Sequence, residues 1–373
     1  MPAEYTTSNE FDLGGLDLKR FELGPKWKRS ISPMSTPSAS TRPTPEHIFN
    51  TLNAYQQSAA LKAAIELDVF TAIDEGKQSA EEIAAFTKAA PRGVRTLCDF
   101  LVIHGFLRKE HDQYRLTVES GLFLSRKSSA YMGTLVGFLV NDRHLQNFSN
   151  LAEAVRRGGT ADTRGDHHKP DETLWVSFAR SMAPITVPSA NYIAHLLDAA
   201  KGEAWQVLDI AAGHGMYGIT LAKNNPNARV TALDWPAVLE VAKENAQKAG
   251  VSARYSVRPG SAFETELGEG YDFVLLTNIF HHFDRQACGQ LMKRVLAALK
   301  PGGKAVTLEF IPNEDRVTPP TAAAFSLIML AGTDAGDAYT LAEYEAMFQE
   351  AGFRNTTLYQ VPEMPQQILI SEK

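Results

Sequence analysis

The chain has 373 residues, of which 44% are hydrophobic and 21% charged, and its formal net charge is −6. This composition is typical of a soluble globular protein with two domains and gives no general attraction to nucleic acid or anionic lipid. A count of two cysteines argues against a disulfide framework, and the lack of an apolar stretch of about 18 residues argues against a membrane span. The lack of a secretory start argues against export, so we expect a cytoplasmic protein.

The first 45 residues are predicted to form a flexible arm, because residues 30–45 consist largely of proline, serine and threonine. From Glu46 onward, apolar residues recur every three to four positions, which predicts helices. Ser79 predicts one helix start and Pro91 another, and residues 106–117 have the pattern of a short hairpin. We therefore expect a helical, winged-helix-like domain over residues 46–165.

A winged helix can bind DNA or serve as a dimerisation scaffold. Between residues 56 and 120, 8 Lys and Arg stand against 10 Asp and Glu, a net charge of −2, whereas a DNA-binding surface is normally basic. The charge favours dimerisation, and a ligand-sensing DNA regulator stays as an alternative. Further helices are predicted over residues 130–145, 150–156 and 171–197, and residues 166–200 are expected to link the two domains and to roof a pocket.

From residue 201 onward, strands and helices alternate, which predicts a mostly parallel, doubly wound sheet. The last two expected strands, residues 355–360 and 367–371, are joined by a turn too short for a crossover helix, so they should pair antiparallel. The earlier strands are expected at residues 206–210, 229–233, 253–258, 271–278 and 305–310.

Glycines follow directly after the first of these strands. Gly213, Gly215 and Gly218 lie in a strand-to-helix turn, where backbone approaches a ligand closely. The spacing also satisfies the dinucleotide fingerprint, with Asp234 in the place of the ribose-binding acid. Asp209, just before the glycines, is unfavourable beside a pyrophosphate and suits a ligand that carries an amino group and a sulfonium.

With this loop, the His-His-Phe-Asp segment 281–284 and the turn 300–304, the chain resembles the S-adenosylmethionine-dependent methyltransferases. Over residues 46–373 it resembles more narrowly the two-domain O-methyltransferases of small phenols, of the plant caffeic-acid type and the bacterial small-molecule type. The resemblance implies an α/β catalytic domain over residues 201–373 with a Rossmann-like sheet of seven strands, the last antiparallel. It also implies a homodimer, S-adenosyl-L-methionine as cofactor, S-adenosyl-L-homocysteine as product and a small aromatic or polyketide-like hydroxyl as acceptor.

In that family, a histidine after the fourth strand acts as general base and a glutamate at the end of the fifth strand supports it. His281 and Glu309 occupy these places. Neighbouring strands lie about 5 Å apart, so the two side chains should face each other. His281 would accept the phenol proton during attack on the methyl group, and Glu309 would hold the imidazole tautomer.

The resemblance also assigns residues to the cofactor and to the acceptor, which should meet at the carboxyl edge of the sheet. The expected cofactor residues are Asp209, Gly213, Gly215, Asp234, Trp235, Ser261, Ala262, Phe263 and Asn278. The expected acceptor residues are Phe178, Met182, His282, Met329, Thr333 and Asp337. The two methionines would confine a flat ring between flexible thioethers.

Three positions depart from the family pattern. Ala338 replaces a second glutamate that often brackets the histidine, so either one carboxylate suffices or Asp337 substitutes. Ser261 replaces the acid at the adenine, which leaves a neutral hydrogen-bonding group. Phe283 replaces a tryptophan, which keeps a flat face but loses an N–H donor.

Two histidine pairs resemble metal ligands: His281–His282 together with Asp284, and His167–His168. Adjacent residues of an extended segment point in opposite directions, and we expect no catalytic metal. His214, within the glycine loop, is expected to be a turn residue. Methyl transfer to carbon or nitrogen on the same scaffold stays an alternative, and the sequence does not identify the acceptor.

Overall fold

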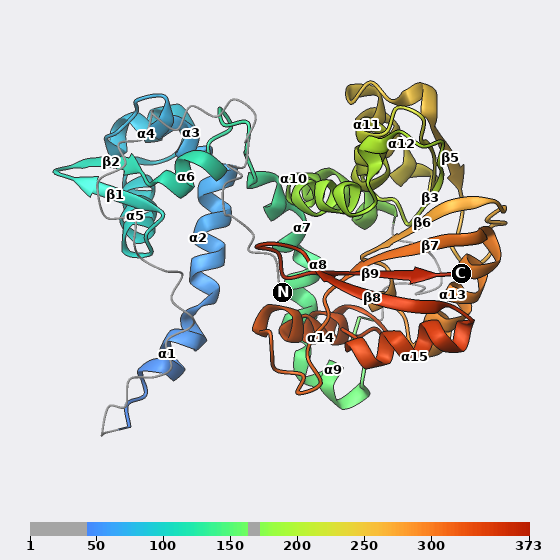
Figure 1. Cartoon of the computed structure of the whole chain (residues 1–373). Coiled ribbons are helices and arrows are strands. Elements are labelled where there is room, and N and C mark those ends of the chain that lie inside the picture. The colour runs from blue at the N-terminus through green and yellow to red at the C-terminus, as the bar shows by residue number, and fades with distance from the viewer. Residues whose placement is uncertain (1–42, 163–171) are drawn as a thin grey trace, which may run out of the picture. The chain divides into compact units, whose positions relative to one another are not determined.

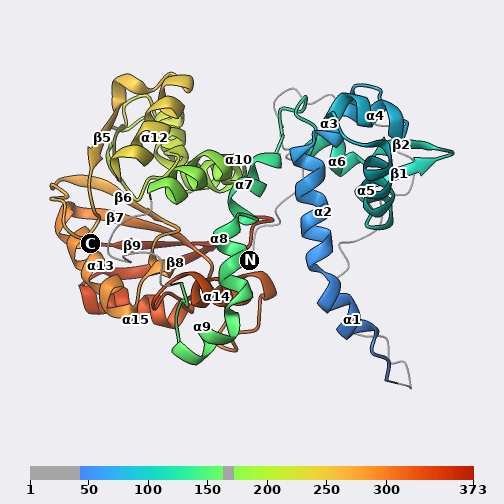
Figure 2. The ribbon, with the colours of Figure 1, turned by 180° about the vertical axis from the view of Figure 1, so that it is seen from behind.

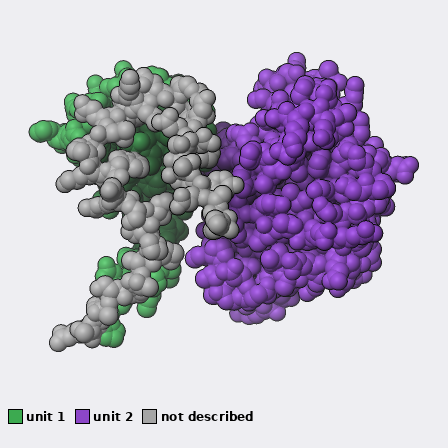
Figure 3. All heavy atoms as spheres, viewed as in Figure 1, with its two compact units in different colours: residues 1–133 green, residues 134–373 purple. Residues whose placement is uncertain are grey.

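The computed structural model describes residues 43–162 and 172–373, which belong to two compact units, residues 1–133 and 134–373 (Figures 1 and 3). Most of the arm expected over residues 1–45, and the predicted histidine pair His167–His168, lie outside the described residues. Among the helices of residues 43–162 and 172–373, none combines the length and the apolar character of a membrane span.

The first unit contains six helices and one hairpin among its described residues. Its elements are α1 (Glu46–Asn53), α2 (Tyr55–Glu66), α3 (Val69–Asp74), α4 (Ala80–Thr87), α5 (Pro91–Ile103), β1 (Leu107–Glu110), β2 (Gln113–Leu116) and α6 (Val118–Phe123). Ser79 caps α4 in a reciprocal capping box with Glu82, and Pro91 begins α5, as predicted. The hairpin is antiparallel, with Leu107 opposite Leu116.

The core of this unit is formed by α2 to α5 together with the hairpin. Phe70, Ile83, Leu101 and Tyr114 are at most 1% exposed. Helix α1 buries none of its residues, and its Ile48, Phe49 and Leu52 are 61%, 59% and 67% exposed. A row of large apolar side chains is therefore left on the surface of one helix.

The second unit begins with helices that precede the sheet. After the 3-10 turn Gly133–Leu135 come α7 (Val136–Leu139), α8 (Asp142–Ser149), α9 (Leu151–Arg157) and α10 (Glu172–Leu196). The single helix predicted over residues 130–145 is wrong, because the side chain of Asn141 accepts the N–H of His144 and starts a new helix there. Residues 134–162, which we expected in the first domain, belong to the second unit.

A seven-stranded sheet forms the centre of the second unit, in the order β5-β4-β3-β6-β7-β9-β8. Its strands are β3 (Gln206–Ile210), β4 (Arg229–Asp234), β5 (Tyr255–Pro259), β6 (Tyr271–Thr277), β7 (Leu299–Glu309), β8 (Arg354–Gln360) and β9 (Gln367–Glu372). Strand β9 is antiparallel to both neighbours, β7 and β8, and the other pairs are parallel. The predicted mostly parallel sheet with an antiparallel last strand is confirmed.

Helices cover both faces of this sheet (Figures 1 and 2). α10, α11 (Met216–Asn224) and α12 (Pro236–Lys248) pack on one face, and α13 (Arg285–Ala298) and α15 (Leu341–Ala351) pack on the other. Helix α14 (Pro320–Gly332) contacts α8 and α9. Alternate residues of β3 face the two layers, so Val207 lies in one core and Leu208 in the other. The carboxyl ends of the parallel strands β3 to β7 therefore lie at one edge of the sheet.

Candidate active site

The glycine loop connects the end of β3 to the start of α11. Gly213 and Gly215 have φ of +57° and +74°, in the left-handed region. A Cβ on Gly215 would lie 2.4 Å from the hydroxyl of Tyr255, and one on Gly218 would lie 2.9 Å from Oδ2 of Asp209. Because side chains at these two positions would collide with their neighbours, the loop requires glycine there.

Asp209 is fully buried beneath this loop. Its Oδ2 accepts the N–H of Gly218 at 3.1 Å, whereas its Oδ1 is buried and has no hydrogen-bond partner. Burial raises the pKa of Asp209 to about 7. A buried carboxylate oxygen without a partner is costly, and a cationic or donor group of a ligand would satisfy it.

Asp234 ties the glycine loop to the end of β4. Its Oδ2 accepts the N–H of Gly213 at 2.8 Å, and its Oδ1 accepts the N–H of Trp235 at 2.7 Å. Burial raises the pKa of Asp234 to about 6. The structure thus brings the predicted cofactor residues Asp209, Gly213 and Asp234 together around one loop.

The segment after β5 carries the predicted adenine residues. The hydroxyl of Ser261 accepts the N–H of Phe263 at 3.2 Å, which closes a tight turn around Ala262. The rings of Phe263 and Phe283 meet edge to face, with centroids 4.8 Å apart. The aromatic residue expected after the two histidines therefore lies against the segment that follows β5.

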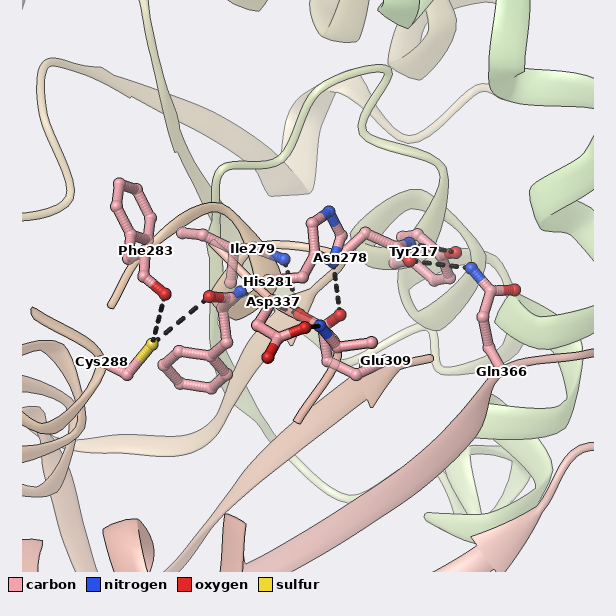
Figure 4. A network of polar contacts seen from close by, with 11 residues as sticks. Tyr217, Asn278, Ile279, His281, Phe283, Cys288, Glu309, Asp337 and Gln366 are labelled. Carbon is pink, nitrogen blue, oxygen red and sulfur yellow. Dashed lines mark hydrogen bonds and ion pairs between the residues drawn. The ribbon is translucent and has the colours of Figure 1, made fainter. Parts of the chain in front are cut away.

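His281 and Glu309 form a direct, buried pair (Figure 4). Nδ1 of His281 lies 2.5 Å from Oε2 of Glu309, and the two residues are 4% and 0% exposed. Oε1 of Glu309 accepts the backbone N–H groups of Ile279 and Phe280 at 2.9 and 2.8 Å. The carboxylate thus fixes both the imidazole and the backbone of the 3-10 turn Phe280–His282. Because Nδ1 is paired with Glu309, Nε2 is the ring nitrogen available to accept a proton.

Two aromatic residues beside His281 were missed in the sequence analysis. The ring of Phe325, on α14, lies 4.8 Å from that of His281 at an angle of 79°, and Phe310 stacks on Phe325 at 4.0 Å. Because Phe310 directly follows Glu309 in the sequence, its place near the site could have been predicted. Nothing in the sequence links Phe325 to His281.

A second aromatic group connects α10 with the glycine loop and the histidine turn. Phe178 stacks on His214 with ring centroids 6.2 Å apart, and Trp175 meets His282 edge to face at 5.2 Å. Burial lowers the pKa of His214 to about 4, and its Nδ1 accepts the N–H of Met216. His214 is thus a neutral residue of the turn. Burial and the neighbouring His281 hold the pKa of His282 well below its usual value.

The other predicted acceptor residues lie on α10, on α14 and in the following loop. Met182 is half-buried on α10, and Met329 is buried on α14. The hydroxyl of Thr333 donates to the carbonyl of Met329 and accepts the N–H of Gly336. The carboxylate of Asp337 contacts Arg316 at 3.4 Å and the N–H of Ala338 at 2.8 Å, so both of its oxygens have partners.

Among residues 43–162 and 172–373, no group of three or more histidine, cysteine, aspartate or glutamate side chains is arranged to hold a metal ion. In the pair His281–His282, the Nδ1 of His281 is taken by Glu309. The predicted ligand Asp284 caps α13 instead, with its Oδ1 accepting the N–H of Ala287 at 2.7 Å.

Comparison with known proteins places this architecture in a family. Residues 148–354 match an O-methyltransferase domain, and residues 49–126 match an O-methyltransferase dimerisation domain. The chain is 28% identical over 302 residues to the 3-hydroxy-5-methyl-1-naphthoate 3-O-methyltransferase of Streptomyces sahachiroi, covering 79% of this chain and 86% of that protein. It is 28% identical over 326 residues to the acetylserotonin O-methyltransferase of Gallus gallus, covering 83% and 92%.

Solved structures of methyltransferases share the fold of this chain. A Nostoc punctiforme protein assigned to the O-methyltransferases is 48% identical, with a TM-score of 0.85 over 89% of this chain and 100% of that one. Human N-acetylserotonin methyltransferase, solved in complex with S-adenosylmethionine, shares the fold at 22% identity, with a TM-score of 0.77 over 90% and 99%.

The winged-helix-like unit and the sheet with its glycine loop define a two-domain methyltransferase architecture. The chain belongs to the O-methyltransferase family, with an O-methyltransferase domain and an O-methyltransferase dimerisation domain. The predicted family and the predicted enzyme class are confirmed.

Proposed function

We propose that this protein transfers the methyl group of S-adenosyl-L-methionine to a hydroxyl of a small aromatic or polyketide-like acceptor, with His281 as general base. The observation that carries the proposal is the buried His281–Glu309 pair. Relatives support the acceptor class, since they include the naphthoate enzyme described above and the tetracenomycin polyketide 8-O-methyltransferase of Streptomyces glaucescens, 26% identical over 315 residues.

Proton removal is the step in which this chain's own residues act. A phenol has a pKa of about 10, so its oxygen is a weak nucleophile near neutral pH until its proton is removed. In the proposed mechanism, Nε2 of His281 accepts the proton from the hydroxyl, and the positive charge on the ring is stabilised by Glu309 through Nδ1. Two backbone N–H groups hold this carboxylate in place, and the carboxylate in turn orients the imidazole through Nδ1.

The residues of the glycine loop fit the donor. Oδ1 of Asp209 is a buried acceptor without a partner, which suits the ammonium group of an amino acid, and the glycines let the backbone approach. Asp234 would accept hydrogen bonds from the ribose hydroxyls, beside Gly213 and Gly215. Trp235, Ser261, Ala262, Phe263 and Asn278 would surround the remainder of the donor. The bound donor supplies an already activated methyl group.

The acceptor would lie between the aromatic group on α10 and the residues of α14. Phe178, Met182 and Met329 would contact its ring, and His282, Thr333 and Asp337 would contact its polar substituents. The edge-to-face contact of Phe325 with His281 supports an aromatic pocket wall at the base. The reaction needs in-line placement of oxygen, methyl carbon and sulfur, and an apolar wall favours that placement by excluding water.

The finer points of the assembly are proposals as well. We propose a homodimer through residues 46–165, catalysis without a metal and a cytoplasmic enzyme. The exposed apolar row on α1 supports association through the first unit. The dimerisation domain match covers residues 49–126 and thus begins within this helix.

The test is methyl transfer to a panel of phenols, catechols and naphthols by the purified protein, with His281→Ala and the exposed His195→Ala as matched variants. General base catalysis contributes about 10²–10⁴-fold, so we expect a loss of that size in kcat for His281→Ala and none for His195→Ala. Near-full turnover by His281→Ala would overturn the general-base role and favour the carbon or nitrogen alternative. Salt-dependent duplex binding without turnover would favour the regulator.

A further inference from the structure

Four polar side chains from four parts of the second unit form a continuous hydrogen-bonded chain, and Figure 4 labels three of them, Gln366, Asn278 and Tyr217. Nε2 of Gln366 donates to Oδ1 of Asn278 at 2.7 Å, and Nδ2 of Asn278 donates to the hydroxyl of Tyr217 at 3.4 Å. The hydroxyl of Tyr217 lies 3.3 Å from that of Ser189. The chain thus joins the β8–β9 connection, the end of β6, the start of α11 and the helix α10.

Asn278 is the central member of this chain because of its backbone. Its φ of +57° is left-handed, a conformation that asparagine tolerates better than most residues. Its N–H donates to the carbonyl of Leu308 at 2.8 Å, next to Glu309. The backbone turns at Asn278 and then enters the 3-10 turn that carries His281, so the conformation of Asn278 sets the direction of that turn.

Tyr217 connects the same chain to the donor loop. It is the second residue of α11, directly after the loop that ends at Gly215, and it is 3% exposed. Ser189 is fully buried and donates to the carbonyl of Thr186. Asn278 is therefore held on one side by the donor-loop helix and on the other by Gln366.

Gln366 is not needed to hold its own hairpin on the sheet. The neighbouring Gln367 does this, because its Nε2 donates to the carbonyl of Ile311 and its Oε1 accepts from Gln360. β9 is also paired with β7 and β8 along its length. The side chain of Gln366 reaches away from this pairing to a residue 88 positions earlier in the chain.

We propose that Gln366 is a positioning residue for His281: its amide fixes the left-handed Asn278 and thereby aims the catalytic imidazole at the acceptor. This inference rests on the proposed general-base role of His281. The side chain of Gln366 hydrogen-bonds to Asn278 and to neither His281 nor Glu309, so its effect runs through the backbone between Asn278 and His281. The C-terminal hairpin thereby contributes to catalysis without supplying a reacting group.

The test compares Gln366→Met, Gln366→Glu and the control Gln360→Met with wild type on an acceptor that the wild type methylates. Methionine keeps the volume and removes the donor. Glutamate can accept from Nδ2 of Asn278 after the Asn278 amide rotates. Tyr217 then donates to Oδ1 of Asn278, and Ser189 turns its hydroxyl from the carbonyl of Thr186 to Tyr217. Misplacement of a catalytic group by about 1 Å costs up to about 10²-fold, so we expect kcat to fall about 10–100-fold for Gln366→Met.

A role in positioning leaves substrate binding intact. We therefore expect KM for the acceptor to stay within about threefold in Gln366→Met. Gln366→Glu should retain most of the turnover, and Gln360→Met all of it. An equal loss in Gln360→Met, an unchanged kcat in Gln366→Met, or an equal loss in Gln366→Glu would each overturn the inference.

A spectroscopic readout separates this inference from the proposed function. The Nδ1 proton between His281 and Glu309 should give a far-downfield proton NMR signal, identified by its loss in His281→Ala. We expect the signal to shift or broaden in Gln366→Met and to stay unchanged in Gln360→Met. An unchanged signal in Gln366→Met overturns the positioning role even where no acceptor is turned over, whereas a wild type without methyl transfer overturns only the proposed function.

Discussion

The substitution Glu309→Gln tests the buried pair, because it keeps the shape and replaces one acceptor by a donor. In the native protein, Glu309 accepts three hydrogen bonds, from His281 and from the N–H groups of Ile279 and Phe280. Glutamine can accept on one side only. If its oxygen faces the two backbone groups, its NH₂ faces Nδ1 and forces the ring proton onto Nε2, which then cannot act as a base.

If the glutamine instead turns its oxygen toward His281, two buried backbone donors lose their acceptor. Each unsatisfied donor costs about 1–3 kcal/mol, so the productive arrangement lies about 2–6 kcal/mol higher. At about 1.4 kcal/mol per tenfold change, kcat should fall about 30-fold to 10⁴-fold. The loss is thus expected to approach that of removing the base itself.

The assay is the initial rate of S-adenosylhomocysteine formation at saturating donor and acceptor. Glu240→Gln, at an exposed position on α12, serves as the control, and thermal unfolding of each variant shows whether it is folded. The double variant His281→Ala/Glu309→Gln should be no slower than His281→Ala, because the two residues act as one unit. A Glu309→Gln enzyme with more than about a third of wild-type kcat would refute the reasoning, since even the lower cost predicts a larger loss.

Three further predictions concern the donor loop and the first unit. Affinity for S-adenosylhomocysteine should rise between about pH 5 and 8, because the buried carboxyl of Asp209, with its pKa raised to about 7, must lose its proton to bind an ammonium group. Calorimetry should find this pH dependence of the affinity reduced in Asp209→Asn. Replacing the exposed Ile48 and Leu52 by lysine should shift the protein toward a monomer in analytical ultracentrifugation, and an unchanged mass would exclude α1 from the interface. Ser79→Ala should lower the free energy of unfolding by about 1 kcal/mol in urea titration through loss of the capping box, with methyl transfer unaffected at 25 °C.

The sheet was predictable from the sequence because its signals are local. Apolar strands alternate with amphipathic helices, and the short connection after β8 forces β9 to run antiparallel. The break at Asn141 was missed because a cap within an apolar stretch leaves the helical spacing almost unchanged. Helix caps are decided by one side-chain hydrogen bond, which a periodicity does not contain.

The site was predictable only in part. His281 and Glu309 could be paired because His281 follows β6 and Glu309 ends the neighbouring strand β7. Phe325 and Gln366 could not be found, since each reaches the site across a long stretch of sequence and neither belongs to a recognisable motif. Such contacts depend on how a helix or a hairpin docks, and docking is a property of the whole core.

The place of β7 within the sheet has a consequence for motion. β7 is flanked by β6 and β9, and its last residue, Glu309, pairs with Gln367 of β9, so Glu309 belongs to an interior strand of the sheet and not to an edge strand. Interior strands open only with the protein as a whole, whereas surface helices open locally at lower free energy, as amide hydrogen exchange shows for many proteins. The helices around the proposed acceptor site can therefore loosen to admit and release small molecules while His281 and Glu309 keep their geometry.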